Sequence, residues 1–306
     1  MSGFIGVNWG SSNFRAYRIA DDGGLIERFA EPAGIASLDR TGMAAQIAKL
    51  AARWPDGGPI YASGMVGSNV GWVDVPYAAC PADLSDVAAV AVDTRFGDTP
   101  VTIVPGLTCH READGGVDIL RGEETELFGL AALQGVADGV VALPGTHTKW
   151  VRIRGGKAVD FLTSMSGEIF DRLTAQGLLA SIVEGEASDG DAFRRAARQA
   201  AERNLGLGSL LFGIRARVIR GELPRADAAS ALRGLLIGSD IADALATFPA
   251  LGAATVPLIG NGPLSRLYAA ALLSADIATV MIEADSASVA GFHAFHRARM
   301  ATGAVT

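Results

Sequence analysis

The sequence contains the same short plan twice, and this repeat restricts the folds that the chain can adopt. Residues 4–19 have the pattern of a strand, a Gly-Ser-Ser turn and a second strand, and residues 140–153 repeat that order. In each copy the second strand meets a glycine turn, at 21–24 or 154–157, and continues into a third strand at 24–30 or 158–163. Glycine turns between β-rich runs are hairpin signals. The chain is therefore expected to form two matched β-meanders.

Helix-rich sequence follows each meander, which favours a duplicated α/β unit over two unrelated hairpins. Helices are expected near 41–53, from about 121, and at 168–184, 190–204, 207–217, 226–245, 264–273 and 286–299. Further strands are expected at 59–62 and 254–259, and residues 63–118 are expected to be a glycine-rich turn followed by an irregular stretch. A chain of 306 residues favours two domains. We predict an N-terminal domain at 1–135 and a C-terminal domain at 136–306.

Composition excludes several classes of function. The net charge is −7 and no basic block is present, which argues against nucleic acid and anionic membrane as partners. No apolar run reaches the roughly 18–20 residues of a membrane span, and the first residues do not resemble a signal peptide. Cys80 and Cys109 lie in no metal-binding or disulfide pattern. We expect a cytoplasmic protein.

The two Gly-Ser/Thr turns are candidates for phosphate binding. A tight turn between strands can direct consecutive backbone N–H groups at phosphate oxygens, and small hydroxyl side chains add donors. Gly10-Ser11-Ser12 and Gly145-Thr146 have this character. Each motif alone is also simply a good turn. Their matched positions favour a pair of turns that hold a polyphosphate between two domains.

A third glycine turn, Gly260-Asn261-Gly262, separates an expected strand from an expected helix. Glycine lets a flat group such as adenosine lie against the backbone. The alternative is an ordinary strand-to-helix turn that requires a positive φ. Its place after both hairpins favours a role in nucleotide binding.

Acidic and basic residues near these turns are candidates for catalysis and substrate binding. Glu123 and Glu124 lie in the first turn of an expected helix, where they are either complements to the helix dipole or a general base for an attacking hydroxyl. Arg121, Arg15 and Lys149 are either surface residues or ligands for an anionic substrate.

Five strings in this chain resemble the 2-dehydro-3-deoxygalactonokinase family of the actin/hexokinase-like ATPases. They lie at 9–16, 62–68, 121–126, 143–151 and 234–238, and the most distinctive reads Leu-Pro-Gly-Thr-His-Thr-Lys-Trp. The resemblance implies two ribonuclease-H-like domains that flank an interdomain cleft. It also implies an enzyme that transfers the γ-phosphate of ATP, with Mg²⁺, to the 6-hydroxyl of 2-dehydro-3-deoxy-D-galactonate in galactonate catabolism.

The resemblance also assigns roles to residues. Gly10, Ser11 and Ser12 would form the first phosphate loop, and Gly145, Thr146 and His147 the second. Gly260, Asn261 and Gly262 would contact adenosine, and Glu124 or Glu123 would be the base. The sugar acid would be bound by Arg15, Ser63, Gly64, Met65, Arg121 and Lys149.

Asn8 departs from the family pattern. An aspartate that orients Mg²⁺ and its waters is usual just before Trp-Gly-Ser, and this chain has asparagine there. If position 8 keeps that role, Asn8→Asp should raise the kinase rate at fixed Mg²⁺. The alternatives are a homologue that binds ATP or a sugar acid without turnover, and a kinase of another sugar acid. The expected partners are a nucleotide and a small sugar acid, and a homodimer is left open.

Overall fold

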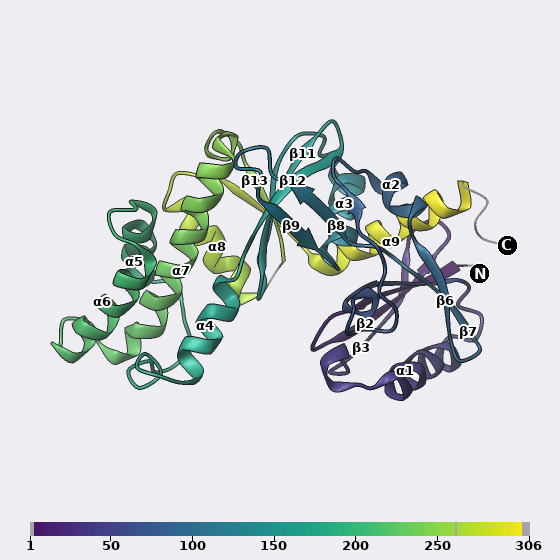
Figure 1. Cartoon of the computed structure of the whole chain (residues 1–306), viewed down its shortest axis with the longest axis horizontal. Coiled ribbons are helices and arrows are strands. Elements are labelled where there is room, and N and C mark those ends of the chain that lie inside the picture. The colour runs from purple at the N-terminus through teal and green to yellow at the C-terminus, as the bar shows by residue number, and fades with distance from the viewer. Residues whose placement is uncertain (1–2, 261, 302–306) are drawn as a thin grey trace.

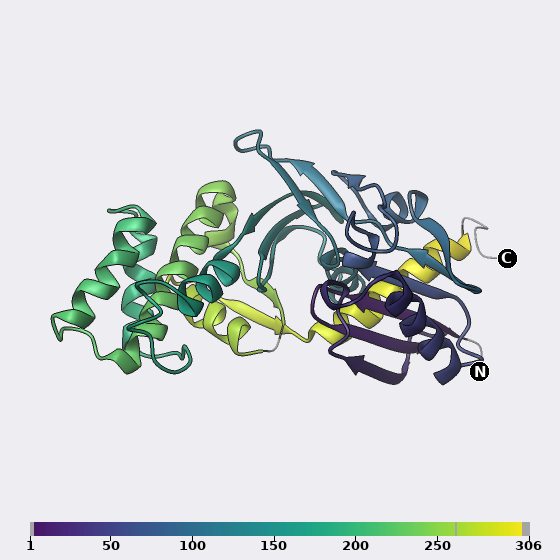
Figure 2. The same ribbon diagram turned by 60° about the horizontal axis from the view of Figure 1, so that its bottom comes forward.

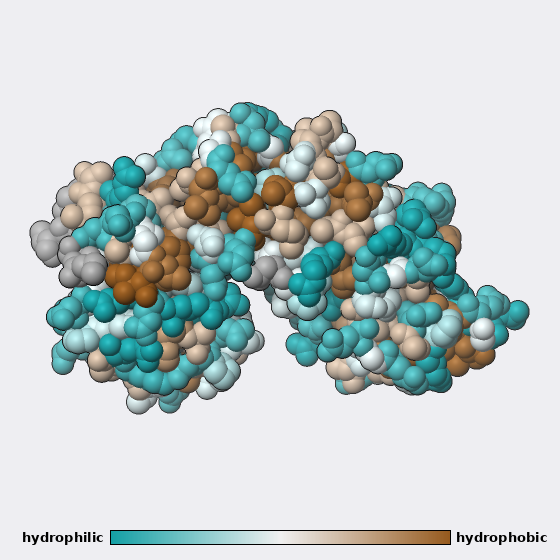
Figure 3. Space-filling model, turned by 180° about the vertical axis from the view of Figure 1, so that it is seen from behind, coloured by the Kyte–Doolittle hydropathy of each residue, from teal (hydrophilic) through white to brown (hydrophobic). Residues whose placement is uncertain are grey.

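The computed structural model describes residues 3–260 and 262–301 and consists of two lobes joined by a shared centre (Figure 1). Seen from behind as a space-filling surface, the lobes stand on either side of an open recess (Figure 3). In the part of the chain that is described, no helix has the length and apolar character needed to cross a membrane.

The first lobe is built on a six-stranded sheet with the order β3-β2-β1-β4-β7-β6. Its strands are β1 (Gly3–Trp9), β2 (Phe14–Ala20), β3 (Leu25–Glu31), β4 (Ile60–Gly64), β6 (Val92–Phe96) and β7 (Thr99–Ile103). β1 runs antiparallel to β2 and parallel to β4, and the register pairs Asn8 with both Arg15 and Ser63. Three candidate side chains therefore start from neighbouring positions at one end of the sheet.

Helix α1 (Arg40–Arg53) covers a face of this sheet. It begins after Asp39, whose carboxylate accepts the Gly42 N–H at 2.7 Å and so satisfies a helix-terminal donor. Ile47 and Leu50 are fully buried and lie on the face that packs on the sheet. Short 3₁₀ turns occur at Ile35–Ser37 (η1), Met65–Gly67 (η2) and Pro249–Ala253 (η3).

The second lobe repeats the plan of the first. Its five-stranded sheet has the order β12-β11-β10-β13-β14. The strands are β10 (Gly139–Leu143), β11 (Thr148–Arg154), β12 (Lys157–Ser164), β13 (Val256–Ile259) and β14 (Thr279–Ile282). β10 is antiparallel to β11 and parallel to β13, just as β1 is to β2 and β4. The duplicated α/β unit expected from the sequence is therefore confirmed.

The expectation of an irregular stretch up to residue 118 is wrong. This stretch contains the β6–β7 hairpin and a small third sheet with the order β5-β8-β9. Its other elements are β5 (Ala78–Ala79), α2 (Leu84–Ala89), β8 (Leu107–His110) and β9 (Val117–Leu120). Pro100 lies within β7, and proline donates no ladder hydrogen bond. For this reason the sequence does not predict a strand there. Pro100 is tolerated since β4 pairs with β7 only at Thr102 and Ile103, beyond the proline.

Helices fill the outer part of the second lobe (Figure 1). They are α4 (Ser166–Ala175), α5 (Asp191–Ala201), α6 (Leu207–Ile219), α7 (Arg225–Thr247) and α8 (Pro263–Leu273). The helix expected at 168–184 is wrong beyond Ala175, because Gly177 has a φ of +94°, which no α-helix contains. Gly234 and Gly238 let α7 approach α5 closely. A Cβ at either would lie 2.3 or 2.1 Å from a backbone oxygen of α5.

Two helices cross where the lobes meet. They are α3 (Glu123–Gln134) and α9 (Ala284–Ala301). A Cβ on Gly129 would lie 1.8 Å from the Ala287 carbonyl oxygen, and one on Gly291 would lie 1.8 Å from the Thr125 oxygen. α9 also packs on β1 and β2, beside which it lies in Figure 2. The last described helix of the chain therefore completes the hydrophobic core next to its first strands.

Candidate active site

The two turns predicted to bind phosphate line the same cavity. Ser11 and Thr146 both contribute to a cavity of about 350 Å³ and to a smaller one of about 230 Å³. Within residues 3–260 and 262–301, the N–H groups of Ser11, Ser12, Thr146 and His147 donate no hydrogen bond. Unpaired N–H groups on consecutive turn residues are donors for an anion. The arrangement is therefore suited to an extended phosphate chain.

The backbone carbonyl oxygens of each turn accept hydrogen bonds from other segments of the protein. The Ile35 and Ala36 N–H groups donate to the carbonyl oxygens of Gly10 and Ser11 at 3.0 Å. On the other side, the Glu168 N–H donates to the Thr146 oxygen at 3.0 Å. Because the carbonyls are engaged on the protein side, the turn conformation is fixed without using the N–H groups.

Two adjacent glutamates at the start of α3 have different surroundings. Glu124 is fully buried, and its carboxylate accepts the Ser63 hydroxyl at 2.7 Å and the Gly122 N–H at 2.6 Å. Burial raises the pKa of Glu124 to about 7, although both hydrogen bonds oppose the shift. Glu123 instead lines two cavities and forms an ion pair with Lys149, at 3.2 Å between Oε1 and Nζ. Of the two candidate bases, Glu123 is the one that a ligand can reach.

Asn8 and Glu126 lie together in the wall of the 350 Å³ cavity. The Asn8 side-chain amide donates to Glu126 Oε1 at 3.5 Å, and the Ser288 hydroxyl donates to the same oxygen at 3.4 Å. Burial and the neighbouring Glu123 charge raise the pKa of Glu126 above its usual range. Arg15, opposite Asn8 on β2, also lines this cavity, and its guanidinium donates no hydrogen bond among the described residues.

A second cavity of about 490 Å³ lies beside the first and shares Met65, Arg121, Glu123 and His147 with it. Arg121 lies over the Tyr77 ring at 4.1 Å, and its Nη2 donates to the Val75 oxygen at 2.6 Å. Its Nε and Nη1 are buried and have no protein partner in the described structure. Unpaired buried guanidinium donors are costly unless a ligand satisfies them, and a guanidinium pairs well with a carboxylate. This cavity is therefore suited to an anionic substrate.

The predicted adenosine turn is described only in part. Gly260 has a φ of +137°, and a Cβ there would lie 2.4 Å from Ser265 Oγ. Gly262 precedes α8, and Asn261 lies outside the described residues. Ile259, just before the turn, lines the 350 Å³ cavity, whereas Gly260 and Gly262 do not.

Most of the residues selected from the sequence surround these cavities. Those that line at least one are Asn8, Gly10, Ser11, Ser12, Arg15, Gly64, Met65, Arg121, Glu123, Gly145, Thr146, His147 and Lys149. Ser63 and Glu124 lie behind the wall and hydrogen-bond each other.

The sequence reasoning missed Glu126, Tyr77 and Asp118. Glu126 could have been found, because it follows Glu123 by three residues and therefore shares its helix face. Tyr77 and Asp118 come from the stretch that was taken as irregular, so no pattern placed them near the site.

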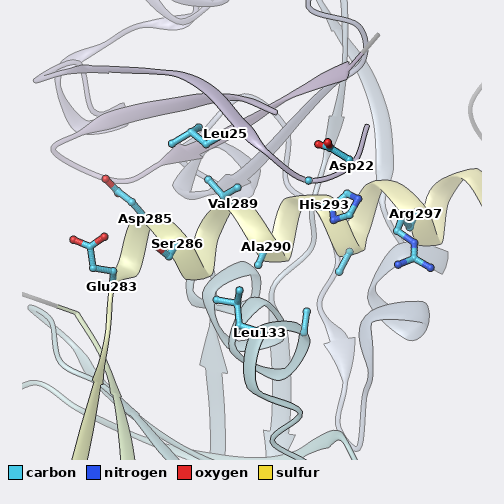
Figure 4. A pocket seen from close by; sticks show the side chains of 13 residues that line it. Asp22, Leu25, Leu133, Glu283, Asp285, Ser286, Val289, Ala290, His293 and Arg297 are labelled. Atoms are coloured by element: carbon cyan, nitrogen blue, oxygen red, sulfur yellow. The ribbon is translucent and has the colours of Figure 1, made fainter. Parts of the chain in front are cut away.

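A further cavity of about 570 Å³ lies away from both turns, between α9, α3 and the β2–β3 turn (Figure 4). Leu25, Leu133 and Val289 contribute apolar side chains, and Asp285 and His293 lie at its edge. The Asp285 carboxylate is already held by Tyr17 and Arg28. None of the residues predicted for catalysis or binding lines this cavity.

Comparisons with known proteins agree with this geometry. A family model described as 2-keto-3-deoxy-galactonokinase matches residues 8–295. The chain is 35% identical to the 2-dehydro-3-deoxygalactonokinase of Escherichia coli (strain K12) over 243 residues, 78% of this chain and 79% of the relative. It is 34% identical to DgoK1 of Rhizobium meliloti (strain 1021), which is named for the same activity, over 96% of this chain and 97% of the relative.

Solved structures give the same result at the level of the fold. A crystal structure of a Sinorhizobium meliloti protein, also named for this activity, has a TM-score of 0.88 at 33% identity, covering 98% of this chain and 99% of that one. Component A of the (R)-2-hydroxyglutaryl-CoA dehydratase of Acidaminococcus fermentans has a TM-score of 0.54 at 11% identity, covering 97% and 99%. The predicted fold class, duplicated ribonuclease-H-like domains of actin/hexokinase type, is confirmed.

Proposed function

Because the chain belongs to the 2-keto-3-deoxy-galactonokinase family, we propose that it transfers the γ-phosphate of ATP to the 6-hydroxyl of 2-dehydro-3-deoxy-D-galactonate. One observation carries the proposal. Two turns from opposite lobes, whose N–H groups have no partner among the described residues, line one cavity. An acid at its edge also lines a second cavity, where guanidinium donors of Arg121 likewise have no partner in the described part of the chain. Phosphoryl transfer needs this combination of phosphate clamp and aligned acceptor.

In the reaction, the two turns position the phosphates and Glu123 acts as the general base. Gly10–Ser12 and Gly145–His147 hold the phosphate chain through backbone N–H groups and hydroxyls, and this placement aligns the γ-phosphorus with the acceptor oxygen. The 6-hydroxyl oxygen forms a bond to phosphorus as the bond to the β–γ bridging oxygen breaks and ADP leaves. Glu123 accepts the hydroxyl proton, a role worth roughly 10²–10⁴ in rate. Glu124, held by Ser63, fixes the start of α3.

The carboxylate of the sugar acid is the group that Arg121 is suited to bind. Its Nε and Nη1 have no partner within residues 3–260 and 262–301, while the Tyr77 ring and the Val75 oxygen fix the guanidinium plane. Lys149 forms an ion pair with Glu123 and lines the same cavity, where it offsets the negative charge of that glutamate. The positive groups are local, which agrees with a chain whose net charge is −7.

Mg²⁺ is part of the proposal, and the residues present fit a metal that is held mainly by the nucleotide. Among the described residues no group of three or more His, Cys, Asp or Glu side chains could hold a metal by itself. Asn8 and Glu126 both line the phosphate cavity, and Mg²⁺ in kinases usually takes one or two protein oxygens together with phosphates and waters. Bound with ATP, Mg²⁺ would neutralise charge on the β- and γ-phosphates.

A coupled assay of ADP release tests this proposal. We expect acceptor-dependent ADP formation with 2-dehydro-3-deoxy-D-galactonate and Mg²⁺, and weaker activity with other 2-keto-3-deoxy acids and with hexoses. Glu123→Gln should lower kcat by roughly 10²–10⁴ and leave nucleotide affinity unchanged. The exposed Glu112→Gln variant is the matched control.

Two other results would change the assignment. Nucleotide binding without ADP formation from any acceptor would mean a binding protein, the alternative that Asn8 raises. Faster turnover of another acid in the panel would move the substrate to that acid.

A further inference from the structure

The charge around position 8 is arranged in an unusual way. Asn8 occupies the point where β1 ends at the first phosphate turn, and its side chain is neutral. Its side-chain amide donates to the carboxylate of Glu126 on α3, at 3.5 Å between Nδ2 and Oε1. The amide thus donates toward a carboxylate that lies in the wall of the same cavity.

We propose that Glu126 supplies the carboxyl group that position 8 lacks, so that Glu126, oriented by Asn8, positions Mg²⁺ and its waters against the phosphates. The inference rests on the proposed function only in placing a nucleotide between the two turns. It adds a positioning residue that family resemblance alone does not assign.

The hydrogen bonding of the three glutamates singles out Glu126. Both oxygens of Glu124 are used by Ser63 and Gly122, and its side chain is fully buried. Glu123 uses Oε1 for Lys149 and Oε2 for the Arg121 N–H. Glu126 uses only Oε1, and its Oε2 has no partner among the described residues. It is the carboxylate of the three with an oxygen left for a metal-bound water.

The hydrogen bonds that the Glu126 carboxylate accepts are long, so a ligand can replace their donors. The donor distances from Asn8 and Ser288 are 3.5 and 3.4 Å, at the upper end for a hydrogen bond. Glu126 also shares its helix face with Glu123, three residues earlier, and so faces the cavity that both phosphate turns line. These hydrogen bonds therefore position the Glu126 carboxylate and leave its second oxygen available for a ligand.

This arrangement reverses one expectation from the sequence. Asn8→Asp alone would place two carboxylates side by side and remove the amide donor to Glu126, so it should not raise the rate. To move the carboxyl group from position 126 to position 8, both changes are required, Asn8→Asp together with Glu126→Gln. The double variant keeps one carboxyl group and one amide, in exchanged positions.

The test is the Mg²⁺ dependence of AMPPNP affinity, measured by isothermal titration calorimetry on the intact protein without any sugar acid. Wild type should bind AMPPNP more tightly with Mg²⁺ than with EDTA. Glu126→Gln should lose about tenfold or more of that enhancement, the scale on which residues around a metal affect its binding, while keeping its metal-free affinity. The Asn8→Asp/Glu126→Gln double variant should regain most of the loss.

Glu112→Gln is the matched control, because it removes a carboxylate from an exposed ion pair and lines neither cavity at the phosphate turns. It should retain the Mg²⁺ enhancement within about twofold. The proposal is overturned if Glu126→Gln keeps the wild-type enhancement, if the double variant is no better than Glu126→Gln, or if Mg²⁺ has no effect on wild type. A normal enhancement with no phosphorylated acceptor would instead remove the substrate assignment and leave this inference standing.

Discussion

At the scale of single residues, neighbours in sequence can have opposite environments. The sequence places Glu123 and Glu124 together at a helix start, but the reachable one is decided by residues far away in the chain. Ser63 on β4 holds Glu124 inside the protein, and Lys149 on β11 holds Glu123 at the cavity. No local pattern encodes these contacts, and for that reason the sequence left both glutamates as candidates.

The first prediction concerns Arg121. Arg121→Lys keeps the charge but loses the planar fork and part of the contact with Tyr77. We expect KM for the sugar acid to rise by about 10–100-fold, since hydrogen bonds between charged groups are worth roughly 1.5–3 kcal/mol, while KM for ATP stays the same. Steady-state kinetics would check it. Arg154→Lys, at an exposed ion pair with Glu112, is the control. An equal change in both KM values would contradict the role.

The second prediction concerns pH. The pKa of Glu124 is about 7 in the folded protein against about 4.5 when exposed, so its contribution to stability is fully present below pH 4.5. That contribution is lost as the pH rises to about 7, by on the order of 3 kcal/mol, because one pKa unit corresponds to about 1.4 kcal/mol. Glu124→Gln should flatten the dependence of the unfolding free energy on pH. Urea titrations of the ligand-free protein between pH 5 and 8 would measure it, with an unchanged slope as the contrary result.

At the scale of elements, the sequence predicted what is regular and missed what is short. Both β-meanders and the long helices were found because glycine turns and apolar periodicity mark them. β14 and the strands of the third sheet were missed, since Val117, Ile119, Val280 and Met281 are exposed and give no buried pattern. The helix expected at 168–184 was predicted to continue beyond the end of α4 at Ala175, although Gly177 was visible as a stop.

The third prediction concerns the crossing of α3 and α9. Gly129→Ala should lower the thermal stability, because the added Cβ has no room beside the Ala287 oxygen, and overpacking of this kind costs about 1–3 kcal/mol. Gly213→Ala in α6 is the matched control, since nothing lies within 4 Å of its added Cβ. That variant should gain about 0.5–1 kcal/mol from reduced chain entropy. Similar melting temperatures for both variants would argue against a close helix contact.

At the scale of the whole molecule, the site is composite. The phosphate turns come from β1–β2 and β10–β11, the acids from α3, and the basic groups from both lobes. The sequence predicted this division because the repeat supplies one turn per lobe. It could not predict which charged groups meet across the recess.

The fourth prediction concerns closure of the recess. Glu123 and Lys149 already pair across the two lobes, and a nucleotide held by both turns would draw the lobes together. We expect the radius of gyration in small-angle X-ray scattering to fall when AMPPNP and the sugar acid are added together. Either ligand alone serves as the comparison. Identical scattering with and without both ligands would indicate a rigid molecule.

The packing of α9 on β1 and β2 also bears on how the polypeptide is made. A ribosome synthesises those strands early, yet the surface that covers them emerges only after the whole second lobe has been translated. Until then, the apolar side chains of the first sheet are exposed to solvent. Chaperones bind nascent proteins in such a state. Expression of the first lobe by itself would leave that surface permanently uncovered, whereas attaching the α9 sequence by a linker would restore its cover.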